Sequence, residues 1–421
     1  MISDKITALL KNKQNTNLFI YGLGQGFNLI TPLLVVPYIV SICGIENYGK
    51  ISIGMAISFF IMVFIDYGSD IIGVKEVAVN RENPIALEKT FITTFTAKFI
   101  LVISILIVTS IIFCFVPFFS SERNLFLLGL PILVGQFINP TWFLQGIENF
   151  KWITILTILS KLIYLFGIFV CIHQKSDYIL INLWWGIGTV LSNSLAFIYV
   201  VRTHNFSFRK TQKRFVLLQL KENFSIFSSQ LFVSLQMYAP IMLIGIFGNN
   251  LLAGHYKIIE QITVIFKTYI YLFFNFVYPR VCYLLDKNSK QAYRFWKTYN
   301  GLNFIFILLS MAGIYFFSTA AVSFFTKSDI EAISGLLRLA TLIPLLISIS
   351  IPLKQLMLGL NKQKLYVRMT TIMVVVNLAG MVLLLPKYQI SGVLITLILT
   401  EATTILIYFY FLKKQIPFQI F

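Results

Sequence analysis

The sequence predicts an all-α integral membrane protein with about 12 transmembrane helices, arranged as two six-helix lobes related by a parallel internal repeat. Three observations support this prediction. Hydrophobic residues make up 57% of the 421-residue chain and charged residues only 12%, outside the usual balance of a soluble domain. The apolar residues form continuous runs long enough to cross a bilayer, and a segment of the first half recurs in the second half.

The individual spans follow from windows of about 20 residues on a transfer scale. The first span, near residues 18–42, is long, has no small-residue cleavage pattern and is followed at once by another span. We therefore expect a retained helix rather than a signal peptide. The first half contains five more spans, near residues 50–73, 91–117, 124–145, 152–172 and 179–201. The second half contains six, near residues 224–248, 253–278, 299–318, 332–358, 366–385 and 390–412.

The internal repeat is clearest around a short polar turn. The stretch GLPILVGQFINPTWFLQGIENFKW from Gly129 aligns with LIPLLISISIPLKQLMLGLNKQKL from Leu342, so that Gly146 matches Gly359 at an offset of 213 residues. Each repeat would contain six spans, and because six is even both halves run in the same direction. A parallel repeat about an axis normal to the membrane is one of the architectures of membrane transporters.

Basic residues are distributed unevenly between the two sets of alternate loops. One set holds 23 Lys and Arg residues and the other holds 5, the asymmetry expected when basic loops stay cytoplasmic. This pattern predicts a multi-pass membrane protein with both termini cytoplasmic. It also predicts an N-terminal lobe at residues 1–205, a basic cytoplasmic linker at 206–222 and a C-terminal lobe at 223–421. Because the net charge of +18 is explained by topology and by anionic lipid headgroups, we expect membrane lipids and no nucleic acid as partners.

Cysteine and histidine patterns suggest neither metal nor redox chemistry. The four cysteines are far apart without a CxxC pair, and the three histidines are isolated, so neither a zinc site nor a disulfide framework is indicated. We expect no metal, no cofactor and no catalytic residue.

Charged residues inside predicted spans are the candidate site residues. A charge at a helix centre costs roughly 2.5 to 3.5 kcal/mol on insertion scales, so each one implies a partner, water or a function. The candidates for substrate binding within the first six spans are Lys98 and Lys161, together with a milder polar face at Gln25 and Asn28. The carboxylates Asp66 and Glu401 are candidates for ion coupling.

The eighth span carries a charged stripe. Lys257, Glu260 and Lys267 are spaced by three and seven residues, which places them on one face of a helix. Either this stripe lines a cavity that meets phosphate or sugar groups, or Glu260 and Lys267 brace the lobe internally. Arg338 in the tenth span is a further candidate for the same positive site.

Three segments resemble the O-antigen unit flippases of bacteria, in the polysaccharide-transporter branch of the multidrug, oligosaccharidyl-lipid and polysaccharide exporter superfamily. They are DYGSDIIGVKEVAVNRENP from Asp66, WFLQGIENFKWITIL from Trp142 and PKYQISGVLITLILTEATT from Pro386. The third departs from the family pattern, since Gly392 is followed by Val393 where relatives often have alanine. The resemblance implies two six-helix lobes in the bacterial inner membrane, which move undecaprenyl-diphosphate-linked oligosaccharides from the cytoplasmic to the periplasmic leaflet by alternating access. It also implies the polymerase and the chain-length regulator of the same pathway as partners.

Two other functions remain open from the residues alone. One is a multidrug or small-cation antiporter of the same superfamily, although the surplus of cations within the spans disfavours a cationic cargo. The other is a membrane-bound glycosyltransferase or polymerase of the same pathway. An enzyme of that kind would be expected to have a large outer loop or an acidic metal-binding motif, and the predicted outer loops are short.

Overall fold

The computed structural model describes residues 13–207, 213–360 and 362–413, and their regular structure is helical. By its contacts the chain separates into two compact units, residues 1–238 and 239–421. The division falls inside one helix, α12 (Lys213–Phe247), rather than in the predicted linker, whose residues 208–212 lie outside the described part of the chain. The predicted six-helix lobes, at residues 1–205 and 223–421, stay a prediction.

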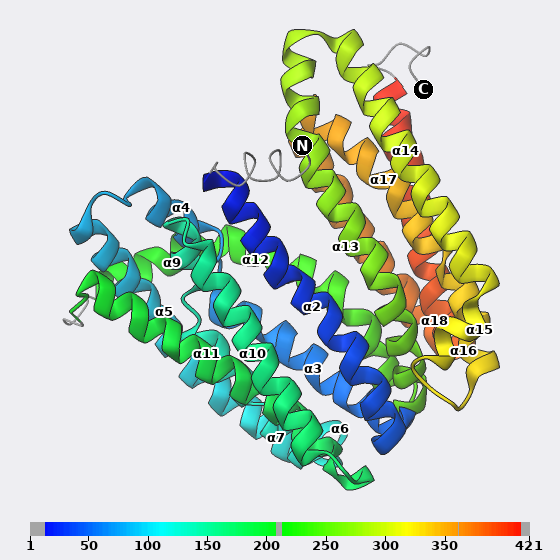
Figure 1. Cartoon of the computed structure of the whole chain (residues 1–421), viewed down its shortest axis with the longest axis horizontal. Coiled ribbons are helices and arrows are strands. Elements are labelled where there is room, and N and C mark those ends of the chain that lie inside the picture. The colour runs from blue at the N-terminus through cyan, green and yellow to red at the C-terminus, as the bar shows by residue number, and fades with distance from the viewer. Residues whose placement is uncertain (1–12, 208–212, 361, 414–421) are drawn as a thin grey trace, which may run out of the picture. The chain divides into compact units, whose positions relative to one another are not determined.

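The described residues of the first unit form ten α-helices before α12 (Figure 1). They are α2 (Lys13–Cys43), α3 (Ile45–Asp66), α4 (Ile72–Val79), α5 (Pro84–Phe115), α6 (Pro117–Ser120), α7 (Arg123–Leu128), α8 (Pro131–Ile138), α9 (Thr141–Gly146), α10 (Phe150–Cys171) and α11 (Ile181–His204), with the 3-10 helix η1 (Lys175–Leu180) before α11.

Asparagines and prolines set several of these boundaries. The Asn83 side chain accepts a hydrogen bond from the backbone of Ala86, and Pro84 occupies the first turn of α5, where its missing N–H is no loss. Asn149 caps α10 in the same way. The predicted span at 124–145 is divided into α7, α8 and α9, with Pro131 in the first turn of α8 and Pro140 at the N-cap of α9. Proline cannot continue the preceding hydrogen-bond ladder, so this span is a chain of short helices.

Within the first unit, α10 packs between α2 and α11, and α11 packs on α8 (Figure 1). The α10–α11 contact is close because a Cβ at Gly188 would lie 2.5 Å from the Ser160 carbonyl oxygen, as is typical of helix contacts in membranes. A core of aromatic and aliphatic side chains from α4, α5, α9, α10 and α11 surrounds the fully buried Phe91. The opposite face of α5 exposes large apolar side chains, as expected for a helix that contacts lipid tails.

In the second unit, the residues that the structure describes form the end of α12 and six further α-helices. They are α13 (Asn250–Lys287), α14 (Ser289–Phe316), α15 (Ser318–Ser323), α16 (Ile330–Ala340), α17 (Leu342–Gly359) and α18 (Gln363–Lys413). Helix α17 contacts α13, α14 and α18, and its Leu353, Leu356 and Met357 lie in the buried apolar core of this unit.

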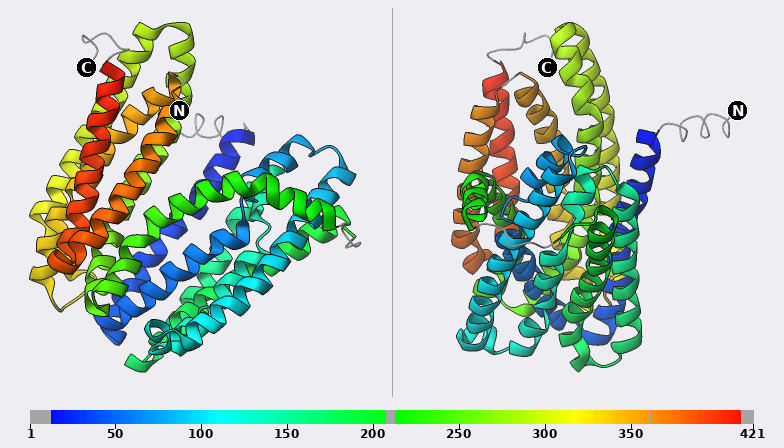
Figure 2. Two further views of the ribbon diagram at one scale, coloured as in Figure 1. Left: turned by 180° about the vertical axis from the view of Figure 1, so that it is seen from behind. Right: turned by 90° about the vertical axis from the view of Figure 1, so that its left-hand side faces the viewer.

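Helix α18 is a helical hairpin that contains the last two predicted spans. Its 51 residues are interrupted at Gln389, where the backbone is not helical (φ 51°, ψ −135°). The two arms are antiparallel, because the Asn377 side chain donates a hydrogen bond to Thr400 at 3.1 Å and the rings of Tyr366 and Tyr408 lie 6.3 Å apart. Figure 2 shows the orange and red arms side by side.

Among the described residues, 11 helices are long and apolar enough to cross a membrane. The predicted number of about 12 agrees with this figure, because α18 is counted once but crosses twice. The prediction of an all-α membrane protein is confirmed.

The internal repeat has a structural counterpart in the turns after α9 and α17. The Asn149 amide donates to the Leu144 carbonyl at 2.8 Å, and the Lys362 amide donates to the Met357 carbonyl at 2.9 Å. These pairs are related by the offset of 213 residues found in the sequence. In both turns the glycine lies against an apolar side chain, since a Cβ at Gly146 or Gly359 would lie 2.5 Å or 2.7 Å from its neighbour. The same local structure is therefore formed in both units.

Candidate functional site

Asp66 and Lys98 form a buried ion pair in the first unit. Asp66 is the last residue of α3 and Lys98 lies on α5. The Lys98 Nζ is 2.9 Å from the Asp66 Oδ1, and only 3% of the lysine side chain and 16% of the aspartate side chain are exposed. Gln136 of α8 donates to the other carboxylate oxygen at 2.6 Å. The sequence assigned these two charges to different roles, and the structure brings them together as one neutral group.

The turn after Asp66 brings the beginning of α12 close to this ion pair. Tyr67 (φ 44°) and Gly68 (φ 81°) have left-handed backbone conformations, which end α3 and favour glycine at the second position. The Tyr67 ring stacks on Phe227 of α12 with centroids 4.4 Å apart. The Gln230 side-chain amide donates to the Asp70 carboxylate at 2.7 Å. Helix α12 is thus held to α3 by one stacked ring pair and polar contacts.

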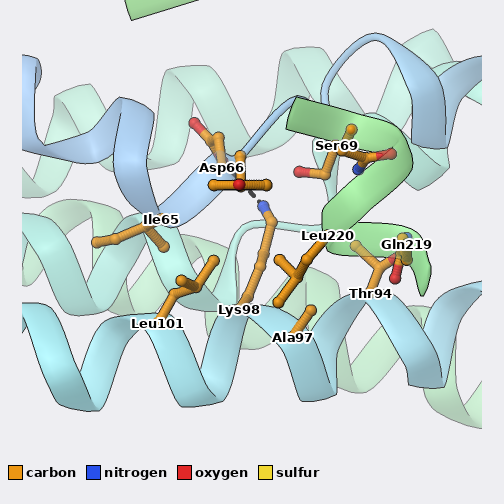
Figure 3. A pocket seen from close by; sticks show the side chains of 11 residues that line it. Ile65, Asp66, Ser69, Thr94, Ala97, Lys98, Leu101, Gln219 and Leu220 are labelled. Atoms are coloured by element: carbon orange, nitrogen blue, oxygen red, sulfur yellow. Dashed lines mark hydrogen bonds and ion pairs between the residues drawn. The ribbon is translucent and has the colours of Figure 1, made fainter. Parts of the chain in front are cut away.

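A small polar pocket lies between α3, α5 and α12, beside the Asp66–Lys98 ion pair. Figure 3 shows the side chains of Asp66 and Lys98 directed toward each other, with Ser69 and Gln219 on the neighbouring side. The Gln219 Nε2 donates to Thr94 at 2.8 Å. The Ser69 hydroxyl and the Gln219 Oε1 have no hydrogen-bond partner among the described residues. Buried polar atoms are usually hydrogen-bonded, so these two atoms are unsatisfied polar groups beside the ion pair.

Two carboxylates, Glu76 of the short helix α4 and Glu222 of α12, lie near each other. Glu76 is half-buried, and both its burial and the nearby Glu222 carboxylate raise its pKa above the ordinary value of 4.5. The charged form of Glu76 is therefore disfavoured in the folded protein.

Lys161 is a buried cation whose contact is an aromatic ring. It lies on α10 with 8% of its surface exposed, and its Nζ is 3.5 Å from the centroid of the Trp185 ring of α11. The ion pairs of the described residues do not include Lys161. A cation–π contact stabilises a buried ammonium by about 2 kcal/mol, less than an ion pair of good geometry provides. The site can therefore accept an anion.

In the second unit, Glu260 pairs with Lys257 rather than with Lys267. The Lys257 Nζ and the Glu260 Oε2 are 2.6 Å apart. Lys267 is on the same face of α13, and the charges of Glu260 and Glu401 both act on it. The described residues provide no ion pair within 4.0 Å for Lys267. The charged stripe therefore consists of one Lys257–Glu260 ion pair and one lysine, Lys267, on which two carboxylates act from a longer distance.

Glu401 belongs to the same polar region of the second unit. It lies in the second arm of α18, and the Ser350 hydroxyl of α17 donates to its Oε2 at 2.9 Å. Lys267 and Lys354 are the cations whose charges act on this carboxylate. The structure thus brings together three of the predicted residues, Lys267, Glu260 and Glu401, from two helices.

The other predicted residues are engaged elsewhere. Asn28 donates to Gln25 at 3.4 Å, so the polar face of α2 is partly satisfied within the helix. Arg338 of α16 is exposed, donates to the Ser318 hydroxyl at 2.9 Å and lies 6.0 Å from the Tyr315 ring. Its contacts are with α14 and α15, and the structure does not group it with Lys267.

The sequence analysis missed Gln136, Trp185 and Ser350, which contact Asp66, Lys161 and Glu401. A lone glutamine in the apolar run PILVGQFI was a usable signal, because an amide within a span needs a partner. Trp185 and Ser350 had no such signal, since tryptophan and serine are common in transmembrane helices.

Comparison with solved structures identifies the class of protein that has this fold. One similar structure is that of the "Lipid II flippase MurJ, inward closed conformation", with a TM-score of 0.74 and 16% identity over 96% of this chain and 89% of that chain. A second is an inward-facing multidrug resistance MATE family transporter of the MOP superfamily, with a TM-score of 0.69 and 14% identity over 96% of this chain and 100% of that chain. The chain therefore shares the all-α fold of these two membrane proteins.

The family follows from the sequence match. Residues 15–284 match the model of the family described as "Polysaccharide biosynthesis protein", and the chain belongs to this family. Two curated relatives carry the name "Putative O-antigen transporter". The protein of Escherichia coli (strain K12) is 24% identical over 276 residues, 66% of this chain and 66% of its own length. The protein of Shigella dysenteriae is 23% identical over 93% of this chain and 98% of its own length.

Proposed function

We propose that this protein moves lipid-linked O-antigen or related polysaccharide repeat units from the cytoplasmic to the periplasmic leaflet of a bacterial inner membrane, by alternating access. The family, the names of the two relatives and the transporter fold support this proposal. The cargo would be an undecaprenyl-diphosphate-linked oligosaccharide, and no bond would be made or broken.

The observation that carries the proposal is the buried Lys161, which has no carboxylate partner in the described part of the chain. A diphosphate that leaves water must exchange its hydration for fixed cations, and a buried lysine without an acid favours an anionic cargo. The same argument disfavours a cationic drug, because like charges repel strongly at low dielectric. Lys267, which has no ion pair among the described residues, is the second proposed diphosphate contact. Asp66 and Glu401 are the proposed coupling carboxylates.

The test is to identify the lipid-linked intermediate that accumulates in cells that lack the protein. In a deletion strain, single undecaprenyl-linked repeat units should be trapped on the cytoplasmic face, and the wild-type chain should restore surface polysaccharide. Lys161→Met should abolish this rescue at normal membrane levels, and Lys161→Arg should keep part of it by retaining the charge. Lys50→Met is the matched control, because Lys50 is paired with Glu122 at 2.6 Å.

Three outcomes would refute the proposal. Rescue by Lys161→Met at the level of the wild type would remove the cation from the mechanism. Single repeat units that reach the periplasmic face of the deletion strain but are not polymerised would instead favour a polymerase. Export of a cationic dye without any effect on the polysaccharide would favour the antiporter.

The proposed orientation places the basic loops and both termini in the cytoplasm. Ser207 is exposed between α11 and α12, so a cysteine at this position should resist a membrane-impermeant thiol reagent in intact cells. A cysteine at Ser328, which is exposed between α15 and α16, should react under the same conditions. The reverse labelling pattern would invert the proposed topology.

A further inference from the structure

The Lys161 contact belongs to a row of aromatic rings that crosses the first unit. The Trp185 ring has Tyr164 of α10 at 5.1 Å and Phe59 of α3 at 5.6 Å between centroids. Phe59 in turn lies 5.9 Å from Tyr238 of α12. Tyr164 is buried, while Phe59, Trp185 and Tyr238 are partly exposed. The row therefore begins at a buried cation and continues as partly exposed ring surface.

The contact between Lys161 and Trp185 is weaker than the contact that an arriving anion would offer. A cation–π contact stabilises an ammonium by about 0.5 to 2 kcal/mol. A hydrogen bond to a charged partner contributes about 1.5 to 3 kcal/mol, and a diphosphate offers several acceptor oxygens. A diphosphate within reach therefore draws the ammonium away from the ring and uncovers one face of the indole.

We infer that Trp185 is a sugar-binding residue, whose ring face receives the first sugar of the headgroup once Lys161 has moved to the diphosphate. This inference rests on the proposed function. The C–H face of a sugar ring packs on an aromatic face, and the sugar and the diphosphate are adjacent in such a lipid. One lysine and one tryptophan therefore distinguish a glycosylated prenyl diphosphate from a bare one.

The test is a binding measurement on the full-length chain in lipid nanodiscs. The probes are a short prenyl diphosphate and the same compound carrying one N-acetylhexosamine. The wild type should bind the glycosylated probe about 5-fold or more tightly than the bare probe, the equivalent of about 1 kcal/mol or more. Trp185→Leu should abolish this preference without weakening the binding of the bare probe, because it removes the ring that competes with the diphosphate for Lys161.

Two further variants separate recognition from loss of structure. Lys161→Met should weaken the binding of both probes by about 10- to 150-fold, the equivalent of 1.5 to 3 kcal/mol. Trp184→Leu is the control, because the Trp184 ring packs over Gly167, where a Cβ would lie 2.0 Å from the ring, and its loss should not change the ratio of the two affinities. Trp185→Phe should keep most of the preference, since the ring face is retained.

The possible failures are distinguishable. If Trp185→Leu weakens both probes equally, or neither, the sugar assignment is wrong while the transport proposal stands. If the wild type binds neither probe, the proposed function fails together with the sugar assignment.

Discussion

Replacing Lys98 with methionine should destabilise the protein strongly, because it leaves the Asp66 carboxylate without its cation. The two charges are 2.9 Å apart, and the lysine side chain is 3% exposed. Removing one partner of a buried ion pair costs about 3 to 5 kcal/mol. Since 1 kcal/mol shifts Tm by roughly 2 to 4 °C in a domain of 150–250 residues, Lys98→Met should lower Tm by roughly 6 to 20 °C.

The double variant Asp66→Asn, Lys98→Met should recover most of this loss. It removes both charges, and an asparagine can still accept a hydrogen bond from Gln136, which lies 2.6 Å from the Asp66 carboxylate. Replacing both members of a buried pair is often close to neutral. The double variant should therefore lie within about 1 kcal/mol of the wild type, a measurable coupling between the two sites.

The assay is thermal unfolding in detergent, followed by size-exclusion chromatography of a fluorescent fusion. Arg81→Met is the matched control, because Arg81 and Glu148 are 3.5 Å apart but 54% and 56% exposed. Exposed pairs contribute about 0 to 1 kcal/mol, so this variant should lose only a few degrees. A Lys98→Met protein as stable as Arg81→Met, or a double variant no better than the single one, would refute the reasoning.

Three further predictions concern other sites. The pKa of Glu76 is raised in the folded protein, so the stability that its protonated form contributes is present below about pH 4.5 and is lost as the pH rises through the raised pKa. Glu76→Gln should therefore raise Tm at pH 7 but not at about pH 4. An equal change in Tm at both pH values would contradict this prediction. Lys267→Ala should abolish surface polysaccharide at normal membrane levels and Lys267→Arg should retain much of it, whereas full transport by Glu260→Gln with Lys267→Met would make the stripe purely structural. A Cβ at Gly146 would lie 2.5 Å from Val77, so Gly146→Ala should cost about 1 to 3 kcal/mol in a thermal assay, and adding Val77→Ala should restore part of it; no recovery would place the strain elsewhere.

The fold could be predicted from the sequence because the bilayer imposes long apolar runs. Only closed hydrogen bonding within a helix satisfies the backbone in lipid, so each run specified a helix. The repeat was visible for a similar reason, since the turns at Gly146 and Gly359 each need a residue without a side chain. The predicted break between the last two spans corresponds to Gln389 in α18.

The partners of the charged residues could not be predicted in the same way. Asp66 and Lys98 are 32 residues apart and lie on different helices, so no spacing rule relates them. On α13, residues three, four and seven positions apart share one face, and the sequence alone could not choose between Lys257 and Lys267 as the partner of Glu260. Side-chain geometry selects Lys257.

The hairpin of α18 has a consequence for how the chain is made. A Cβ at Gly392 would lie 2.6 Å from the Leu384 carbonyl oxygen, so the two arms approach each other immediately beside the break at Gln389. The buried Asn377 and Thr400 face each other across the arms. The Thr400 hydroxyl also donates to the Thr396 carbonyl within its own arm, but the Asn377 amide would lose its Thr400 partner in lipid if the first arm entered the bilayer alone. During biosynthesis the two arms are therefore best released into the membrane as a preformed pair, with the ribosome still holding the chain when the first arm is complete.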